Sequence, residues 1–275
     1  MADKIIRIFS DLHYGERSSR VRSLKQLAPL LDGVDTLILN GDTLDTRHGP
    51  YPEHTAAVVA EVKEFLGRAT PKIIPLSGNH DPDFSALHAL ELANGRVLVT
   101  HGDTLFEDIV PWGRDAPDIR RQIAAGLAAL TPAERDSFAA QAAIYRRVSA
   151  ALPQRHQAER NLFKYVVSFI RDTFWPPTRF LHVLRAWREA PERAAALARQ
   201  HWPEARFIIL GHLHRPGIWQ SRDGRVVINT GSFCPPFGAC LVDLTPGRLV
   251  VRRIAARGGA FYPGRQVAEF ALAEA

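Results

Sequence analysis

Short apolar runs alternate with segments of helical periodicity over the first hundred residues. Runs with the length of buried strands lie at 4–9, 36–39 and 72–76, and helical spacing of apolar residues marks 21–31 and 55–66. Residues 90–93 and 96–100 flank Asn94-Gly95, and this dipeptide predicts a hairpin with a two-residue turn. This alternation predicts an α/β fold.

The pattern changes in the middle of the chain. Alanine and arginine dominate residues 107–203, and helical spacing replaces the strand-like runs there. Strand-like runs resume later, at 206–210, 226–229, 239–244 and 249–254. We therefore predict an α/β core made of residues 1–106 and 204–275, with residues 107–203 inserted as a helical lid or cap.

Polar residues that can bind metal follow several of the predicted strands. They are Asp11, His13, Asp42, Asn79, His101, His212 and His214. Because the carboxyl ends of parallel strands share one edge of a sheet, we expect these side chains to lie close together. Histidine nitrogens mixed with carboxylate and amide oxygens suit borderline divalent ions such as Mn, Fe, Co or Zn. The sequence therefore predicts a metal site at that edge.

Five short motifs carry these residues in a fixed order. They are Asp11-Leu12-His13, Gly41-Asp42-Thr43-Leu44-Asp45, Gly78-Asn79-His80-Asp81, His101-Gly102-Asp103 and Gly211-His212-Leu213-His214. Together they resemble the calcineurin-like metallophosphoesterases, although each motif alone is a weak signal. The resemblance covers residues 4–103 and 206–254 and implies a four-layer αββα sandwich, interrupted by the inserted cap.

The resemblance implies a site for two divalent ions, with Mn, Fe or Zn as the expected metals. One ion would be held by Asp11, His13 and His214, the other by Asn79, His101 and His212, and Asp42 would bridge them. Such a pair of ions can hold a bridging hydroxide that attacks phosphorus in line. The chain is therefore predicted to be a metal-dependent phosphoric ester hydrolase, either a phosphodiesterase or a nucleotide-type pyrophosphatase.

Further roles follow from the same resemblance. His80, next to the ligand Asn79, would stabilise the transition state or protonate the leaving oxygen, so both residues are predicted to be catalytic. Asp45 and Asp81 are predicted to orient a histidine. Candidate substrate contacts are Arg47, His48, Lys164 and Arg215.

A narrower resemblance gives an alternative substrate. The run from His101 to Leu105 and the Arg215-Pro216 pair are similar to the UDP-2,3-diacylglucosamine hydrolases, which cleave a pyrophosphate bond in a lipid precursor and also carry a helical lid. Those enzymes usually have Arg where this chain has His80. The apolar stretch 162–181 would form either an acyl-chain groove or the small core of the lid itself.

Charge distribution bears on the partner. The formal net charge is +6, and residues 107–203 carry 15 Lys and Arg against 10 Asp and Glu. A basic lid favours an anionic phosphoester, either a small molecule or a lipid-linked nucleotide, or an anionic membrane face. A DNA nuclease of the same fold is a weaker alternative because the chain has no long Lys/Arg cluster. A metal-binding scaffold without catalysis is a further alternative, although it would have no need of His80.

Location and assembly are less constrained by the sequence. The chain has two cysteines and no uncharged apolar run near the roughly 18 residues that span a bilayer. We therefore expect a soluble cytoplasmic protein, with a peripheral membrane contact left open. The sequence does not indicate an oligomeric state.

Overall fold

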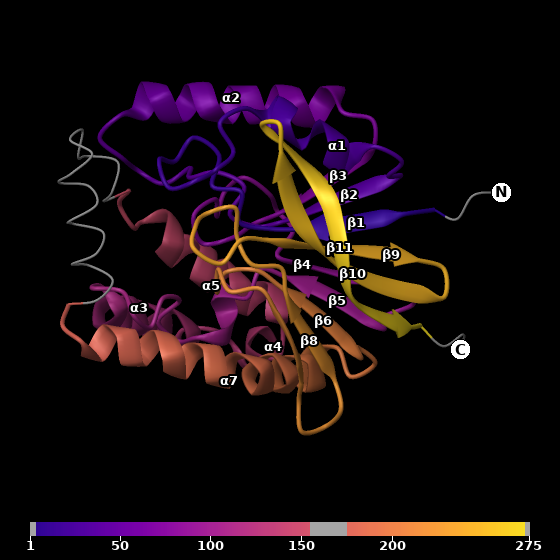
Figure 1. Cartoon of the computed structure of the whole chain (residues 1–275). Coiled ribbons are helices and arrows are strands. Elements are labelled where there is room, and N and C mark those ends of the chain that lie inside the picture. The colour runs from indigo at the N-terminus through magenta and orange to yellow at the C-terminus, as the bar shows by residue number, and fades with distance from the viewer. Residues whose placement is uncertain (1–3, 155–174, 273–275) are drawn as a thin grey trace.

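The computed structural model describes residues 4–154 and 175–272, with two β-sheets at the centre of the molecule (Figure 1). The larger sheet has the order β11-β10-β9-β1-β2-β3, and the smaller has the order β4-β5-β6-β8-β7. The strands of the larger sheet are β1 (Ile6–Phe9), β2 (Thr36–Asn40), β3 (Lys72–Leu76), β9 (Cys240–Thr245), β10 (Arg248–Arg257) and β11 (Ala260–Ala271). Those of the smaller sheet are β4 (Ala89–Leu92), β5 (Val97–Thr100), β6 (Phe207–Leu210), β7 (Gly217–Gln220) and β8 (Val226–Asn229).

Parallel strands form the middle of each sheet. β1, β2 and β3 pair in parallel, with Ile8 opposite Ile38 and Ile38 opposite Ile74. β5, β6 and β8 are likewise parallel to one another. Side chains from both sheets, including Ile8, Val99 and Ile209, meet in one buried apolar cluster. The sheets therefore pack face to face, and their predicted apolar runs form the central core.

Helices cover the outer face of the larger sheet. α2 (Pro52–Arg68) confirms the helix predicted at 55–66, and it lies on the indigo side of the molecule (Figure 1). The predicted helix at 21–31 is instead a 3-10 helix, η1 (Leu24–Leu27), followed by the short α1 (Ala28–Leu31). Pro29 lies in the first turn of α1. It has no N–H to donate to the preceding turn, so one continuous α-helix cannot form there.

The smaller sheet is covered by a helix from the predicted insertion. Ala186, Ala190 and Ala194 of α7 (Thr178–His201) pack against Ile208 and Val227 of the sheet. Three other helices of the insertion are α3 (Ala116–Ala128), α4 (Pro132–Arg135) and α5 (Phe138–Ala150), and α3 and α5 share a separate small cluster. Hence α7 completes the αββα sandwich, which confirms the predicted fold class, whereas α3 and α5 pack mainly on each other.

Some elements differ from the sequence-based expectations. The β4–β5 connection has four residues, 93–96, and not two, because Leu92 pairs with Val97. Ala93, Asn94 and Gly95 all have positive φ in this loop. β7 and β11 were not predicted. β11 lies at the edge of its sheet, the position in which a strand tolerates Pro263 and an exposed face.

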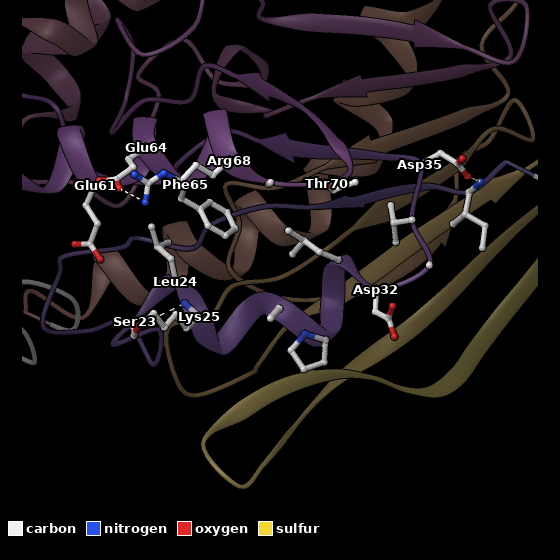
Figure 2. A pocket seen from close by; sticks show the side chains of 17 residues that line it. Ser23, Leu24, Lys25, Asp32, Asp35, Glu61, Glu64, Phe65, Arg68 and Thr70 are labelled. Carbon is white, nitrogen blue, oxygen red and sulfur yellow. Dashed lines mark hydrogen bonds and ion pairs between the residues drawn. The ribbon is translucent and has the colours of Figure 1, made fainter.

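A groove with a volume of about 1330 Å³ lies between α1 and the end of α2 (Figure 2). Its walls include Leu24, Pro29, Phe65 and Arg68. None of the residues that line it is a predicted metal ligand, so the candidate chemistry lies elsewhere. Among the described residues, no helix is both long enough and apolar enough to cross a membrane.

Candidate metal centre

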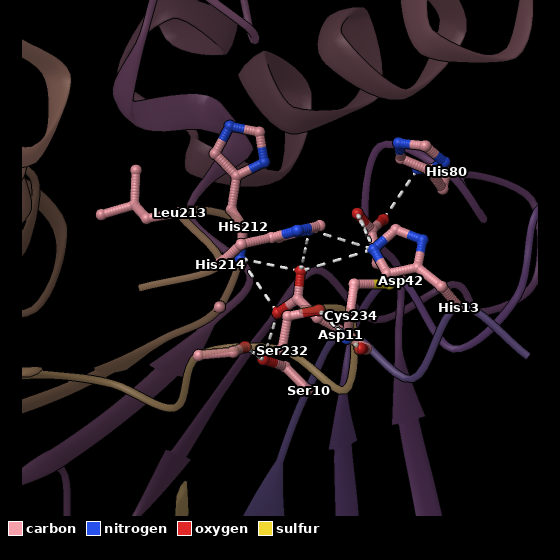
Figure 3. Close-up of polar contacts among 12 residues, drawn as sticks. Ser10, Asp11, His13, Asp42, His80, His212, Leu213, His214, Ser232 and Cys234 are labelled. Atoms are coloured by element: carbon pink, nitrogen blue, oxygen red, sulfur yellow. Dashed lines mark hydrogen bonds and ion pairs between the residues drawn. The ribbon is translucent and has the colours of Figure 1, made fainter. Parts of the chain in front are cut away.

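Loops that follow β1, β2, β5 and β6 bring the predicted histidine and aspartate ligands into two adjoining groups. Figure 3 shows the first of them, with Asp11, His13, Asp42 and His214 close together. The first group consists of Asp11, His13, Asp42 and His214, and the second of Asp42, His101 and His212. Within each group the ligand atoms lie within 4.8 Å of one another. Asp42 belongs to both groups, which is the arrangement expected of a bridging ligand.

The first group is held together around Asp11. His214 Nε2 lies 3.1 Å from Asp11 Oδ1 and 3.0 Å from His13 Nε2. His13 Nδ1 lies 2.8 Å from Glu16 Oε1, a carboxylate oxygen that accepts its hydrogen. His13 Nε2 therefore faces Asp11 and Asp42, whose oxygens are each 3.8 Å away. A carboxylate that fixes the tautomer of a histidine in this way is typical of metal sites.

His101 in the second group shows the same pattern with a backbone partner. Its Nδ1 lies 2.8 Å from Asn40 O, which can only accept, so Nδ1 carries the hydrogen. Its Nε2 then faces Asp42 Oδ2 at 3.3 Å. Across the described part of the chain this buried Nε2 finds no hydrogen-bond partner. A buried ring nitrogen that faces a carboxylate and has no other partner fits a metal ligand, with the metal replacing its proton.

His212 completes the second group together with Asn79. Its Nε2 donates to Ile109 O at 2.8 Å, so its Nδ1 offers a lone pair. Asn79 Oδ1 lies 2.8 Å from that Nδ1. Two acceptor atoms that face each other at this distance are stabilised by a cation between them. The donor types and their orientation therefore fit a divalent metal in both groups.

The electrostatics of the two groups also favour cations. Burial lowers the pKa of His101, but the charge of Asp42, its close contact with the ring and the charges of Asp11 and Asp103 together outweigh burial and raise it to about 10. Burial and the neighbouring His101 lower the pKa of His212 to about 4, so this ligand is neutral. Burial raises the pKa of Asp42, yet the charges of His101 and His80 hold it well below its usual range. The carboxylates therefore stay ionised beside the histidine nitrogens.

Backbone conformation sets the predicted ligands apart. Eight non-glycine residues in the described ranges have positive φ, and five of them are Asp11, His13, Asp42, His212 and His214. A non-glycine residue in this region costs on the order of 1–3 kcal/mol, and such strain concentrates at functional sites. Contacts elsewhere in the fold must therefore stabilise the strained backbone of the loops that carry these ligands.

His80 lies beside both groups in a network of charged side chains. Its Nδ1 is 3.2 Å from Asp45 Oδ2, 3.3 Å from Glu16 Oε1 and 2.8 Å from Arg47 Nη2. Burial and Arg47 lower the pKa of His80, but Asp42, Asp45 and Glu16 outweigh them and raise it to about 9. Asp45 thus contacts a histidine, and its predicted role in orienting that ring stays a prediction.

Asp81 does not take that predicted role. Its carboxylate contacts backbone instead, accepting hydrogen bonds from the N–H groups of Gly78, Asp42 and Thr43. Burial and the nearby Asp42 raise the pKa of Asp81 to about 6. Asp81 thus joins the Asp42 loop to the Asn79 loop, and among residues 4–154 and 175–272 it makes no hydrogen bond to a histidine.

The four predicted substrate contacts have different surroundings. Arg47 makes a bidentate ion pair with Asp45 next to His80. Arg215 lies over the Trp187 ring, 4.9 Å from its centroid. His48 contributes its backbone carbonyl, which accepts from the Gln154 N–H, and Lys164 lies outside the described residues, as does most of the apolar stretch 162–181. Of the three that lie within the described residues, Arg47 alone is tied to the His80 network.

Two functional positions escaped the sequence motifs. Glu16 contacts both His13 and His80, and its place three residues after His13 is the one signal that could have indicated it. Ile109 acts through its carbonyl oxygen and a positive φ, which no side-chain motif encodes.

The basic residues of the insertion are partly used within the fold. Arg120 pairs with Asp108 at 2.7 Å, and Arg121 pairs with Asp118. Arg146 donates from Nε to Pro82 O at 2.8 Å. The positive charge of the insertion is therefore partly neutralised by its own acidic residues.

Comparison with known proteins gives the same family as the sequence motifs. The model of one protein family, described as calcineurin-like phosphoesterase, matches residues 5–216. No curated protein matches the chain. Among solved structures, a dimetal phosphatase from Danio rerio is similar with a TM-score of 0.48 and 13% identity over 98% of both chains.

Two further structures show comparable similarity. A predicted phosphoesterase from Streptococcus pneumoniae TIGR4 has a TM-score of 0.41 and 17% identity, over 98% of this chain and 99% of its own. Vacuolar Protein Sorting 29 from Cryptosporidium parvum has a TM-score of 0.45 and 12% identity over 98% of both chains. The assignment of a family rests on the sequence match and not on these structural similarities.

Proposed function

The chain belongs to the calcineurin-like phosphoesterase family, and from that premise we propose that it is a metal-dependent phosphoester hydrolase acting as a phosphodiesterase or nucleotide-type pyrophosphatase. The observation that carries the proposal is the pair of ligand groups joined at Asp42, with His80 beside them. Two adjoining cation sites and a proton donor are the parts that hydrolysis of a phosphoester needs.

Each ligand group has a defined part in the proposed reaction. Asp11, His13 and His214 would hold one divalent ion, Asn79, His101 and His212 the other, and Asp42 would contact both. When bound, the ions would supply the positive charge that makes phosphorus electrophilic and a water molecule acidic. Mn, Fe and Zn are the metals that this nitrogen and oxygen donor set suits.

His80 would protonate the leaving oxygen. Asp45 and Glu16 flank its Nδ1, so that Nε2 remains for the substrate. The backbone N–H of His80 donates to Asp42 Oδ1 at 2.8 Å, which ties the proton donor to the shared ligand. Arg47 holds Asp45 in place by its bidentate contact. A histidine that can donate a proton helps most when the leaving group is a poor one such as an alkoxide.

Metal reconstitution tests the proposal. The full chain, stripped with a chelator, is assayed on bis(p-nitrophenyl) phosphate, a nucleoside diphosphate ester and duplex DNA, with Mn²⁺, Zn²⁺ or Fe²⁺ added. We expect turnover of a small phosphoester that depends on the added metal. On an ester whose leaving group is an alkoxide, His80→Ala should lower kcat by about 10²–10⁴-fold, and the loss on bis(p-nitrophenyl) phosphate, which releases a stable phenolate, should be smaller. The matched control His54→Ala, on the exposed face of α2, should leave kcat unchanged.

Absence of turnover with every metal, in protein that binds metal and melts cooperatively, would contradict the hydrolase and favour a binding scaffold. Cleavage confined to DNA would replace the small-molecule substrate with nucleic acid.

A lipid-linked pyrophosphate is the second candidate substrate. Four large apolar side chains near the start of α7 are exposed to solvent, namely Trp175, Phe180, Leu181 and Leu184. Such a surface can contact acyl chains or an anionic membrane face. A substrate series that differs only in acyl length tests this, because kcat/KM should rise with chain length. If kcat/KM does not change with acyl length, a water-soluble phosphoester remains the proposed substrate class.

A further inference from the structure

We propose that His88 is a positioning residue for the second ligand group, because it ties the loop that carries Asn79 to the loop that carries His101. This inference rests on the proposed metal centre. His88 Nδ1 lies 2.8 Å from Ser77 Oγ, and Ser77 is two residues before Asn79. His88 Nε2 lies 3.0 Å from Asp103 Oδ1, and Asp103 is two residues after His101.

The tie joins the two sheets at the metal end of the molecule. Ser77 directly follows β3 of the larger sheet, and Asp103 follows β5 of the smaller sheet. His88 itself precedes β4, and its carbonyl accepts from Thr100 Oγ1 at 3.0 Å. One imidazole ring thus connects three segments that each lead into or out of a strand.

Backbone carbonyl oxygens orient two ligands of the second group. His101 and His212 donate to the carbonyl oxygens of Asn40 and Ile109. Their mutual placement therefore depends on the relative position of β2, which ends at Asn40, and of the loop before α3 that contains Ile109. A rigid connection between the Asn79 and His101 loops, such as His88 provides, fixes the distance between the ligands they carry.

Burial excludes a nucleophilic role for the same three side chains. A serine, a histidine and an aspartate that are joined in this order by hydrogen bonds resemble a hydrolytic triad. Ser77 and Asp103 are both 0% exposed, however, and His88 is 6% exposed. A substrate cannot reach the Ser77 hydroxyl, so the chain of hydrogen bonds acts on the structure and not on the reacting atoms.

Variants that keep only one of the two ligand groups test the proposal. The test measures metal binding and does not require the protein to be active. In a His214→Ala background, which keeps the second group, adding His88→Ala should weaken Mn²⁺ binding by about 10–100-fold, the usual effect of losing an orienting contact. In a His212→Ala background, which keeps the first group, the same change should alter Mn²⁺ affinity less than about threefold. Titration calorimetry and the electron paramagnetic resonance signal of free Mn²⁺ give both constants.

A rescue variant and a stability control separate positioning from general weakening. His88→Gln keeps an amide that can donate toward Asp103, so it should recover part of the lost affinity. Val251→Ala, buried in β10 away from the site, should lower the melting temperature without selective loss at the second group.

Equal losses in both backgrounds, no loss in either, or the same selective loss in Val251→Ala would overturn the proposal. If wild-type protein binds no Mn²⁺, the metal centre and this inference fail together. Binding of Mn²⁺ without any hydrolysis would instead refute the proposed function and leave the inference intact.

Discussion

The two ligand groups of the candidate metal centre differ in exposure and in what orients them. The His214 side chain of the first group is 40% exposed, whereas His101 and His212 of the second group are 0% and 4% exposed. In the first group a side chain, Glu16, fixes the tautomer of His13. In the second group backbone carbonyls do so.

This difference determines how the metal affinity of each ligand group can be changed. An ion in the first group would face solvent and exchange readily, and its affinity can be tuned by changing Glu16. An ion in the second group would lie in the interior, where the lower dielectric strengthens its attraction to Asp42. Its orienting atoms belong to the backbone, so they change only when the fold around them moves.

Loss of the ligand shared by both groups should have the largest effect. Asp42→Asn removes a charge that faces both groups, so we expect binding of both ions to weaken. We expect kcat/KM for a phosphoester to fall by about a thousandfold, which corresponds to about 4 kcal/mol of transition-state stabilisation. Metal content by plasma mass spectrometry and steady-state kinetics check this. Retention of one tightly bound ion would show that Asp42 serves a single group.

Much of this arrangement could be predicted from the sequence. The apolar runs that became β1, β2, β3, β5 and β6 are short and continuous, and in parallel strands such runs indicate the edge where ligands gather. The division of ligands implied by the motifs agrees with the two groups in the structure. Local motifs were sufficient here because each ligand directly follows its strand.

The features that could not be predicted from the sequence depend on contacts between distant segments. Asp81 was assigned to a histidine, but its carboxylate is held by three backbone N–H groups from two loops. Residue identity cannot distinguish those partners. α7 was assigned to the insertion because its alanine-rich periodicity predicts a helix without revealing which surface it covers. Small residues on that face permit close packing on a sheet, which only the tertiary structure shows.

Removing an exposed ligand should affect one half of the centre. His214→Ala leaves the second group complete, so we expect one Mn²⁺ per chain to remain bound and the weaker of two binding phases to disappear. His101→Ala is the matched change in the second group, and it should remove the tighter phase. Calorimetric titration of the two variants distinguishes the phases. If His214→Ala removes the tighter phase, burial does not determine the order of affinity.

The smallest effect is expected from Glu16, which touches no predicted ion directly. Glu16→Gln weakens the hydrogen bond to His13 Nδ1, so Mn²⁺ affinity of the first group should fall by about 10–100-fold while the second group is unchanged. Glu64→Gln is the matched control, because Glu64 is an exposed carboxylate of α2 that pairs with Arg68 on the same helix. The Mn²⁺ titrations described above provide the readout. An equal loss in both groups would mean that Glu16 acts through the net charge of the site, since orientation of His13 alone cannot reach the ion beside His101.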